Sequence, residues 1–126
     1  MDEGALKAVG GFGGGIASSG STCGVLLGAV TAISSLHSRG NLNEKENPRL
    51  WGVSNKLIKE FDQLVKPYGG RNCRDIARID WSKKDEVKDY YSNPDSRRQE
   101  CTRIVGDFAF TLGQTLEKEL AKLENS

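Results

Sequence analysis

The C-terminal quarter of the chain carries an apolar stripe at helical spacing, and this stripe constrains the fold more than any other feature. From about residue 96 to residue 123, apolar side chains recur every three or four positions: Cys101, Ile104, Val105, Phe108, Leu112, Leu116, Leu120 and Leu123. This spacing places them on one face of an α-helix. Because an apolar face must be covered by other elements, the stripe predicts a helical bundle.

Other segments favour helices as well. Residues 50–65 show the same amphipathic spacing, in Leu50, Val53, Leu57, Phe61 and Leu64. Shorter or less regular helices are predicted at residues 1–9, 22–36, 72–79 and 81–91. No segment alternates apolar and polar residues convincingly, as a half-buried strand would. We therefore predict an all-α, single-domain helical bundle of about four main helices with a glycine-rich loop, spanning residues 1–126.

The glycine-rich loop lies early in the chain, where glycine fills five of the six positions from Gly10 to Gly15. Each glycine costs a helix roughly 1 kcal/mol relative to alanine, so no helix continues through this run. The remaining residue, Phe12, is expected to be buried and to anchor the loop. We expect four of the glycines either to adopt backbone conformations that other residues cannot take or to let the backbone pass close to the cysteine sulfurs. These are Gly11, Gly13, Gly14 and Gly15.

The segment that follows has the glycine spacing of a phosphate-binding loop, from Gly15 to Thr22. Such a loop follows a strand and needs a lysine to neutralise phosphate. Here no strand is predicted before it, and Ser21 occupies the position of the lysine. The motif therefore argues against nucleotide binding.

The balance of charge limits the classes of partner. The chain has 18 basic and 17 acidic residues, a net charge of +1, so it lacks the basic excess of nucleic-acid-binding proteins. The longest apolar run, residues 23–33, is shorter than the roughly 20 residues that span a bilayer. The acidic start, Met1-Asp2-Glu3, does not resemble a secretory signal. We expect a cytoplasmic protein that binds neither nucleic acid nor membranes.

Three cysteines are the candidate functional residues. Cys23 opens an apolar run, and Cys73 follows Asn72, a residue type that caps helices. A thiol at a helix N-terminus meets the positive end of the helix dipole, so we expect a lowered pKa at Cys23 and Cys73. Cys101 lies on the C-terminal stripe, and we expect all three to approach one another. Such cysteines are typically catalytic, redox-active or metal-bound; the alternative is that they are small buried hydrophobic residues.

Other residue types with potential chemistry are assigned structural roles. His37, the single histidine, follows Cys23 by 14 residues on one predicted helix, or roughly 21 Å, too far to share a metal ion. It is expected to be a solvated residue at the helix C-terminus. Four carboxylates are expected to be solvated, Glu60, Asp62, Glu86 and Glu100. Four aromatic residues are expected to serve in packing, Trp51, Trp81, Tyr90 and Tyr91.

Two motifs together resemble a known family. Gly11-Phe12-Gly13-Gly14-Gly15 is followed by Cys23-Gly24-Val25-Leu26-Leu27-Gly28-Ala29. This combination resembles the small bacterial and archaeal redox-active proteins with four cysteines and a CGAxxG signature. Cys73 and Cys101 correspond to the third and fourth family cysteines. Val25 replaces the alanine of the signature, and the first family cysteine has no counterpart.

The resemblance implies a redox role for the cysteines. It implies Cys23, Cys73 and Cys101 as catalytic residues or as metal ligands of an iron–sulfur cluster, with Gly13, Gly14 and Gly24 beside the cofactor. A fourth ligand would come from water, a small molecule or a partner's thiolate, so a homodimer is one expectation. One function is electron transfer, through a cluster or dithiol/disulfide chemistry, to a redox partner protein or small-molecule carrier. The alternative is a non-catalytic metal-handling or interaction module with structural cysteines.

Overall fold

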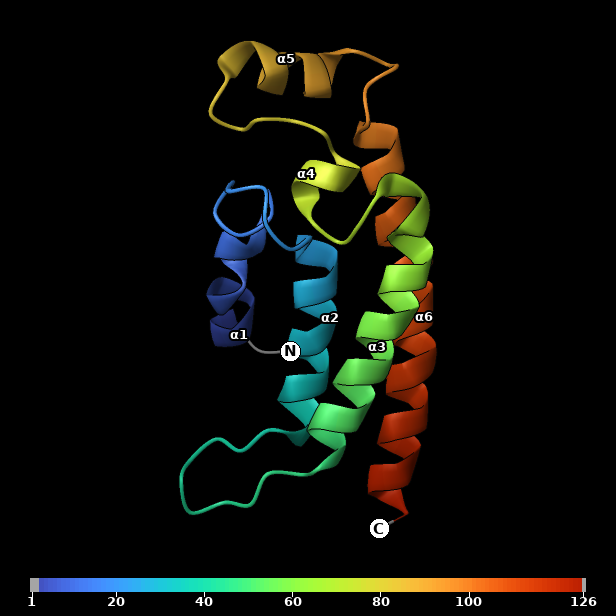
Figure 1. The fold of residues 1–126 in the computed structure, drawn as a ribbon. Coiled ribbons are helices and arrows are strands. Elements are labelled where there is room, and N and C mark those ends of the chain that lie inside the picture. Colours follow the sequence, from blue (N-terminus) through green and yellow to red (C-terminus); the bar gives the residue numbers. More distant parts are fainter. Residues whose placement is uncertain (1–2, 126) are drawn as a thin grey trace.

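The computed structural model describes residues 3–125 and is built from helices (Figure 1). In chain order these are α1 (Glu3–Ala8), η1 (Gly10–Phe12), α2 (Gly24–His37), α3 (Arg49–Val65), η2 (Lys66–Tyr68), α4 (Cys73–Ile76), α5 (Lys84–Ser92) and α6 (Arg98–Glu124). No strand forms among the described residues, which confirms the all-α prediction. Met1 and Asp2, assigned above to the first helix, lie outside the described residues, as does Ser126.

The three long helices α2, α3 and α6 lie side by side and enclose the core (Figure 1). Phe61 of α3 and Phe108 of α6 pack edge to face there, with ring centroids 5.0 Å apart. The short helix α4 lies at the end of this bundle where α2 begins, and α5 lies beyond it (Figure 1). The buried core cluster comprises Leu26, Ala29, Ile33, Leu50, Val53, Leu57, Phe61, Val65, Ile76, Ile104 and Phe108.

The apolar stripe on α6 is buried only in part. Ile104 and Phe108 are buried as predicted, and Leu112 and Leu116 pack against the core. The prediction of one continuous stripe is wrong at three positions, since Val105, Leu120 and Leu123 are exposed. Val105 is turned by about 100° from its neighbour Ile104, away from α2 and α3. Leu120 and Leu123 follow Glu119, which lies against the first residue of α3, so they extend past the end of the bundle.

The packing role expected of Trp51 is also wrong. Its side chain is 62% exposed on α3, and its indole N–H donates to Glu46 Oε1 at 2.7 Å. A single exposed aromatic side chain of this kind is ordinary for a folded protein. Within residues 3–125, no helix is long and apolar enough to cross a membrane.

A buried polar network closes the end of the bundle where α2 stops and α3 starts. His37 is 3% exposed rather than solvated, because its Nε2 lies 3.0 Å from Oε1 of the buried Glu119. A carboxylate only accepts hydrogen bonds, so Nε2 carries the proton and donates it. Nδ1 then accepts from the side-chain amide of Asn47, at 3.3 Å. The prediction of a solvated His37 failed because its partner is 82 residues away in sequence.

Arg49 completes this network from the start of α3. Its Nε and Nη2 each lie 2.6 Å from a carboxylate oxygen of Glu119, a bidentate pair. The hydrogen bonds from Arg49 and His37 lower the pKa of Glu119 to about 2. Glu119 is therefore ionised at neutral pH, and its buried charge is paired by a cation, as burial of a charge requires.

Candidate functional site

Two cysteines are brought together by backbone pairing between distant segments. Thr22 and Asn72 form an isolated antiparallel bridge. The N–H of Cys23 donates to Arg71 O at 2.9 Å, and the N–H of Cys73 donates to Ser21 O at 2.6 Å. Cys23 and Cys73 are thus diagonal neighbours on one face of the pair, which places such residues roughly 7–8 Å apart. The starts of α2 and α4 are fixed to each other at the cysteines.

The glycine-rich loop passes directly against Cys73. At Gly15, φ is +70°, and an added Cβ would lie 2.5 Å from Ser21 O and 2.6 Å from Cys73 Cβ. Only glycine fits such a position without moving its neighbours. Gly14 also has a positive φ, +63°, and an added Cβ there would lie 2.7 Å from Ser18 Cα. The conformation expected of the glycines is therefore confirmed at Gly14 and Gly15.

The same expectation is wrong at Gly11 and Gly13. Both lack a positive φ, and an added Cβ at either would meet no atom within 4 Å. Phe12 is half-buried rather than buried, and its carbonyl oxygen lies against the start of α2. A Cβ at Gly24 would lie 2.9 Å from that oxygen. Close packing against Phe12 therefore explains why position 24 is glycine. A cofactor-binding role for Gly13, Gly14 and Gly24 stays a prediction.

The left-handed segment extends beyond the glycines. Positive φ angles continue through three ordinary residues, Ile16 (66°), Ala17 (50°) and Ser18 (62°). Each costs roughly 1–2 kcal/mol in this conformation. Backbone hydrogen bonds hold the turn, among them Ser18 N–H to Gly13 O at 3.0 Å and Ser21 N–H to Gly15 O at 2.8 Å. Such strain persists where the surroundings hold it, often beside functional sites.

The third cysteine joins the pair from the first turn of α6. Cys101 packs against the core cluster, as does Cys23, and all three cysteines are free thiols that are half-buried. Each pair is close enough for electrostatic repulsion between thiolates: Cys23 interacts with both others, and Cys101 interacts with Cys73. The structure therefore brings together the three cysteines selected from the sequence; their catalytic and metal-binding roles stay predictions.

Burial controls the ionisation of two of these thiols. Burial raises the pKa of Cys23 above its ordinary value, although the N–H groups of Val25 and Leu26 act in the opposite direction. The lowered pKa expected at Cys23 is therefore wrong: the helix N-terminus acts as expected, but desolvation outweighs it. The pKa of Cys101 is raised as well, first by burial, while a hydrogen bond from Tyr90 lowers it.

Aromatic side chains cover the thiols and donate hydrogen bonds to them. The indole N–H of Trp81 donates to Cys73 Sγ at 3.4 Å, and the Tyr90 hydroxyl donates to the sulfur of Cys101. The two rings pack edge to face at 5.2 Å, and Tyr91 packs on Tyr90 at 5.1 Å. Sequence reasoning treated Trp81 and Tyr90 as packing residues only, because their spacing gave no indication of a sulfur partner.

Removing the tyrosine hydroxyl should make Cys101 harder to ionise. In Tyr90→Phe the bond that favours the thiolate is lost, so the pKa of Cys101 should rise further. The pH dependence of Cys101 alkylation by iodoacetamide, followed by peptide mass spectrometry, would report the shift. Tyr91→Phe is the matched control, since Tyr91 is largely exposed. An identical pH profile in both variants would contradict the assignment of the hydrogen bond.

Arg97 and Glu100, which precede Cys101 in the chain, bond to neighbouring segments. The Arg97 Nε–H donates to Ile76 O at 3.0 Å, and its guanidinium lies 5.4 Å from the centre of the Tyr68 ring. Glu100 accepts from the Tyr68 hydroxyl at 2.7 Å, which raises the pKa of Tyr68. Glu100 is thus half-buried and bonded, and its expected solvation is wrong.

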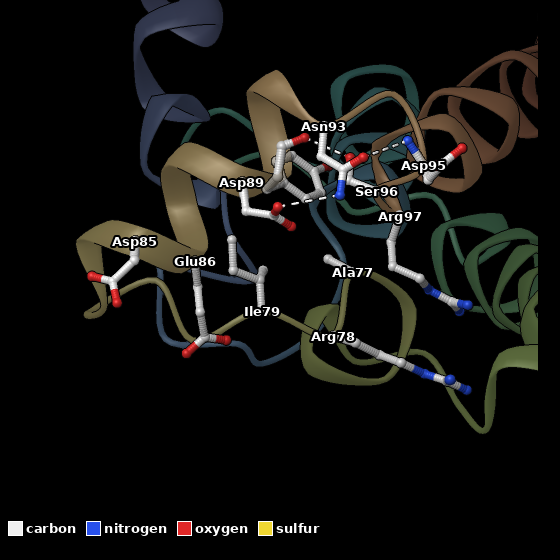
Figure 2. A pocket seen from close by; sticks show the side chains of 11 residues that line it. Ala77, Arg78, Ile79, Asp85, Glu86, Asp89, Asn93, Asp95, Ser96 and Arg97 are labelled. Carbon is white, nitrogen blue, oxygen red and sulfur yellow. Dashed lines mark hydrogen bonds between the residues drawn. The ribbon is translucent and has the colours of Figure 1, made fainter.

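A cavity of about 390 Å³ borders the same aromatic cover (Figure 2). Tyr90, which bonds Cys101, lines it together with ten other residues: Ala77, Arg78, Ile79, Asp85, Glu86, Asp89, Asn93, Asp95, Ser96 and Arg97. In this view the carboxylates of Asp85 and Glu86 lie at one side, and the guanidinium groups of Arg78 and Arg97 point away from them. The cover over Cys101 therefore has open space behind it.

The three thiols are not arranged as the ligands of a single metal ion. Across residues 3–125, no group of three or more His, Cys, Asp or Glu side chains is arranged to hold a metal ion. His37, the one imidazole, belongs to the polar network at the other end of α2. An iron–sulfur cluster typically takes four cysteine ligands, and the chain has three cysteines, so a fourth ligand would have to come from outside the chain and a cluster here stays a prediction.

Comparisons with known proteins agree with the motifs in the sequence. A family model described as "Putative redox-active protein (C_GCAxxG_C_C)" matches residues 1–115. This match confirms the resemblance drawn from the glycine-rich loop and the cysteines. No curated protein matches the chain, and no solved structure matches it.

Proposed function

Because the chain belongs to the family of putative redox-active proteins (C_GCAxxG_C_C), we propose that Cys23, Cys73 and Cys101 form one thiol–disulfide redox site. The observation that carries this proposal is the electrostatic coupling of three free thiols that come from three distant segments of the chain. Isolated structural cysteines have no need to lie within reach of one another. The oxidant is a disulfide, on a small-molecule carrier or on a partner protein.

Cys73 is the thiol that attacks the carrier. It interacts with both other cysteines, and its sulfur accepts the indole N–H of Trp81 at 3.4 Å. Cys23 and Cys101 each carry a raised pKa, so each is ionised less often at neutral pH than an ordinary cysteine. Attack on a disulfide forms a Cys73–carrier disulfide and releases one carrier thiolate, which takes up a proton.

A second cysteine then resolves this intermediate. Cys23 or Cys101 loses its proton and attacks the sulfur of Cys73; the Cys73–carrier bond breaks, and a second carrier thiol leaves. Two electrons have passed from two protein thiols to the carrier, and one disulfide has formed within the chain. A dithiol reductant reverses both steps. No step of this exchange passes through an iron–sulfur cluster, since the chain supplies only three of the four cysteines that such a cluster typically takes.

We also infer a cytoplasmic location. Three free thiols suit a reducing compartment, in which disulfides form only transiently during catalysis or sensing. A second copy of the chain remains one candidate for the protein partner that carries the disulfide.

Kinetics of single-cysteine variants test this order of attack. With glutathione disulfide as oxidant, Cys73→Ser should slow the first exchange by about tenfold or more, because the attacking thiolate is gone. Cys23→Ser and Cys101→Ser should keep that first step, and the one that lacks the resolving thiol should accumulate the mixed disulfide at Cys73. Equal first-step rates in Cys73→Ser and the unmodified protein would contradict the proposal.

A further inference from the structure

Residues 80–96 leave the bundle and return to it above the thiols. This segment, called the strap here, contains α5, which stands apart from the three long helices (Figure 1). No residue of α5 is buried. A segment with so little buried apolar surface is held by few contacts and opens at low free energy.

Two of the contacts that hold the strap are directed at the sulfurs. Trp81 donates to Cys73 Sγ at 3.4 Å from the first turn of the strap, and Tyr90 donates to the sulfur of Cys101 from α5. The edge-to-face packing of their rings joins the two contacts. The Ser96 hydroxyl donates to Tyr90 O at 2.6 Å and secures the far end.

Open space surrounds these contacts. The cavity in Figure 2 lies on one side of Tyr90. A second cavity, of about 400 Å³, borders Tyr90, Tyr91 and the first turns of α6. A third, of about 290 Å³, lies between Trp81, Arg74 and the left-handed turn. Trp81 and Tyr90 therefore each border open grooves as well as the sulfurs they contact.

Disulfide formation changes the position of a sulfur atom. The two sulfurs of a disulfide lie about 2.05 Å apart, so a sulfur that pairs must move toward its partner and away from the donor that it faces in the reduced protein. We propose that Trp81 and Tyr90 are positioning residues that hold the strap closed on the reduced thiols and release it when they are oxidised. Of this proposal, only the oxidation of the thiols rests on the proposed function.

The same contacts link the position of the strap to the redox state of the sulfurs in both directions. If the reduced sulfurs hold the strap, the strap must favour the reduced sulfurs by the same free energy. Trp81→Phe and Tyr90→Phe should therefore make the protein easier to oxidise, and shift its equilibrium with a glutathione redox buffer by about two- to fivefold toward the disulfide.

Limited trypsin digestion tests the release. Diamide oxidises the protein: it takes two electrons and two protons from two thiols, which form a disulfide, and becomes a hydrazine. Cleavage at the strap lysines, Lys83, Lys84 and Lys88, should then rise about tenfold or more relative to the reduced protein. Cleavage at Lys45, in the exposed loop between α2 and α3, is the internal control and should not change. In Tyr90→Phe and Trp81→Phe the strap of the reduced protein should already be cleaved faster.

Fluorescence gives a second reading of the same event. The chain has two tryptophans, and Trp51→Phe leaves Trp81 as the single indole. Its emission should move to longer wavelength on oxidation, as Trp81 leaves the sulfur for water. Unchanged strap cleavage and unchanged emission in protein proved to be oxidised would overturn the strap proposal and leave the redox site standing. If diamide oxidises the thiols and releases the strap, but a disulfide carrier does not oxidise them, the proposed function would be overturned instead. Failure of diamide to oxidise the thiols would overturn both.

Discussion

Replacing Gly15 with alanine should destabilise the protein by about 3 kcal/mol and expose Cys73. The added Cβ would lie 2.5–2.7 Å from Ser21 O, Cys73 Cβ and Ser21 N, so backbone must move. Overpacking of this kind costs about 1–3 kcal/mol, and an L-residue at φ +70° adds roughly 1–2 kcal/mol. Urea unfolding followed by circular dichroism would give the change in the free energy of unfolding. The rate of Cys73 alkylation would show the change at the site.

Gly13→Ala is the matched control in the same loop. Gly13 has φ −59°, and a Cβ there meets nothing within 4 Å. Alanine should therefore be tolerated at position 13, within about 0.5 kcal/mol of the unmodified protein. Equal stability and equal thiol reactivity in the two variants would mean that the loop is a flexible linker with no part in building the site.

Replacing Glu119 with glutamine should cost about 3 kcal/mol at neutral pH, because Arg49 and His37 lose a buried charged partner. Since the pKa of Glu119 is lowered from 4.5 to about 2 in the folded protein, its contribution is complete above pH 4.5. This contribution is lost as the pH falls from 4.5 toward about 2, where the folded protein must also take up the proton. The difference in stability between the two proteins should therefore shrink over that range.

Urea unfolding at about pH 7 and about pH 3 would measure this difference. Glu117→Gln is the control, since Glu117 is exposed on the same helix and should change stability by less than about 0.5 kcal/mol. A stability difference between Glu119→Gln and the unmodified protein that stays constant with pH would show that Glu119 contributes by packing and not by charge.

Local patterns in the sequence predicted the helices well, because apolar spacing depends on residues within a few turns. The burial of Leu57 and Phe61 on α3 follows directly from it. The position of Cys101 on the α6 stripe and of Cys23 and Cys73 at helix starts also pointed to a shared site. The exposed Val105 and Leu120 could not be predicted, because the stripe gives no indication of how wide a face the neighbouring helices cover.

Contacts between distant segments were beyond sequence reasoning. The pair of His37 and Glu119 joins residues 82 positions apart, and neither residue has a neighbour that indicates the partner. The sulfur contacts of Trp81 and Tyr90 depend on the path of the strap. The direction of the Cys23 pKa shift depends on two opposed effects, and only the burial in the folded structure shows that desolvation outweighs the helix N-terminus.

A thiol count by mass spectrometry tests the central claim, that the three cysteines form one redox site. The fully reduced protein is exposed to glutathione disulfide, unreacted thiols are alkylated, and the peptides are mapped without reduction. The account predicts that two of the three thiols are lost as one disulfide that includes Cys73, that one thiol remains, and that a dithiol restores all three. Three unreacted thiols, or separate stable glutathione adducts on each cysteine, would contradict it and favour structural cysteines. Stoichiometric iron with visible absorption after anaerobic reconstitution would contradict the dithiol chemistry and favour a cluster.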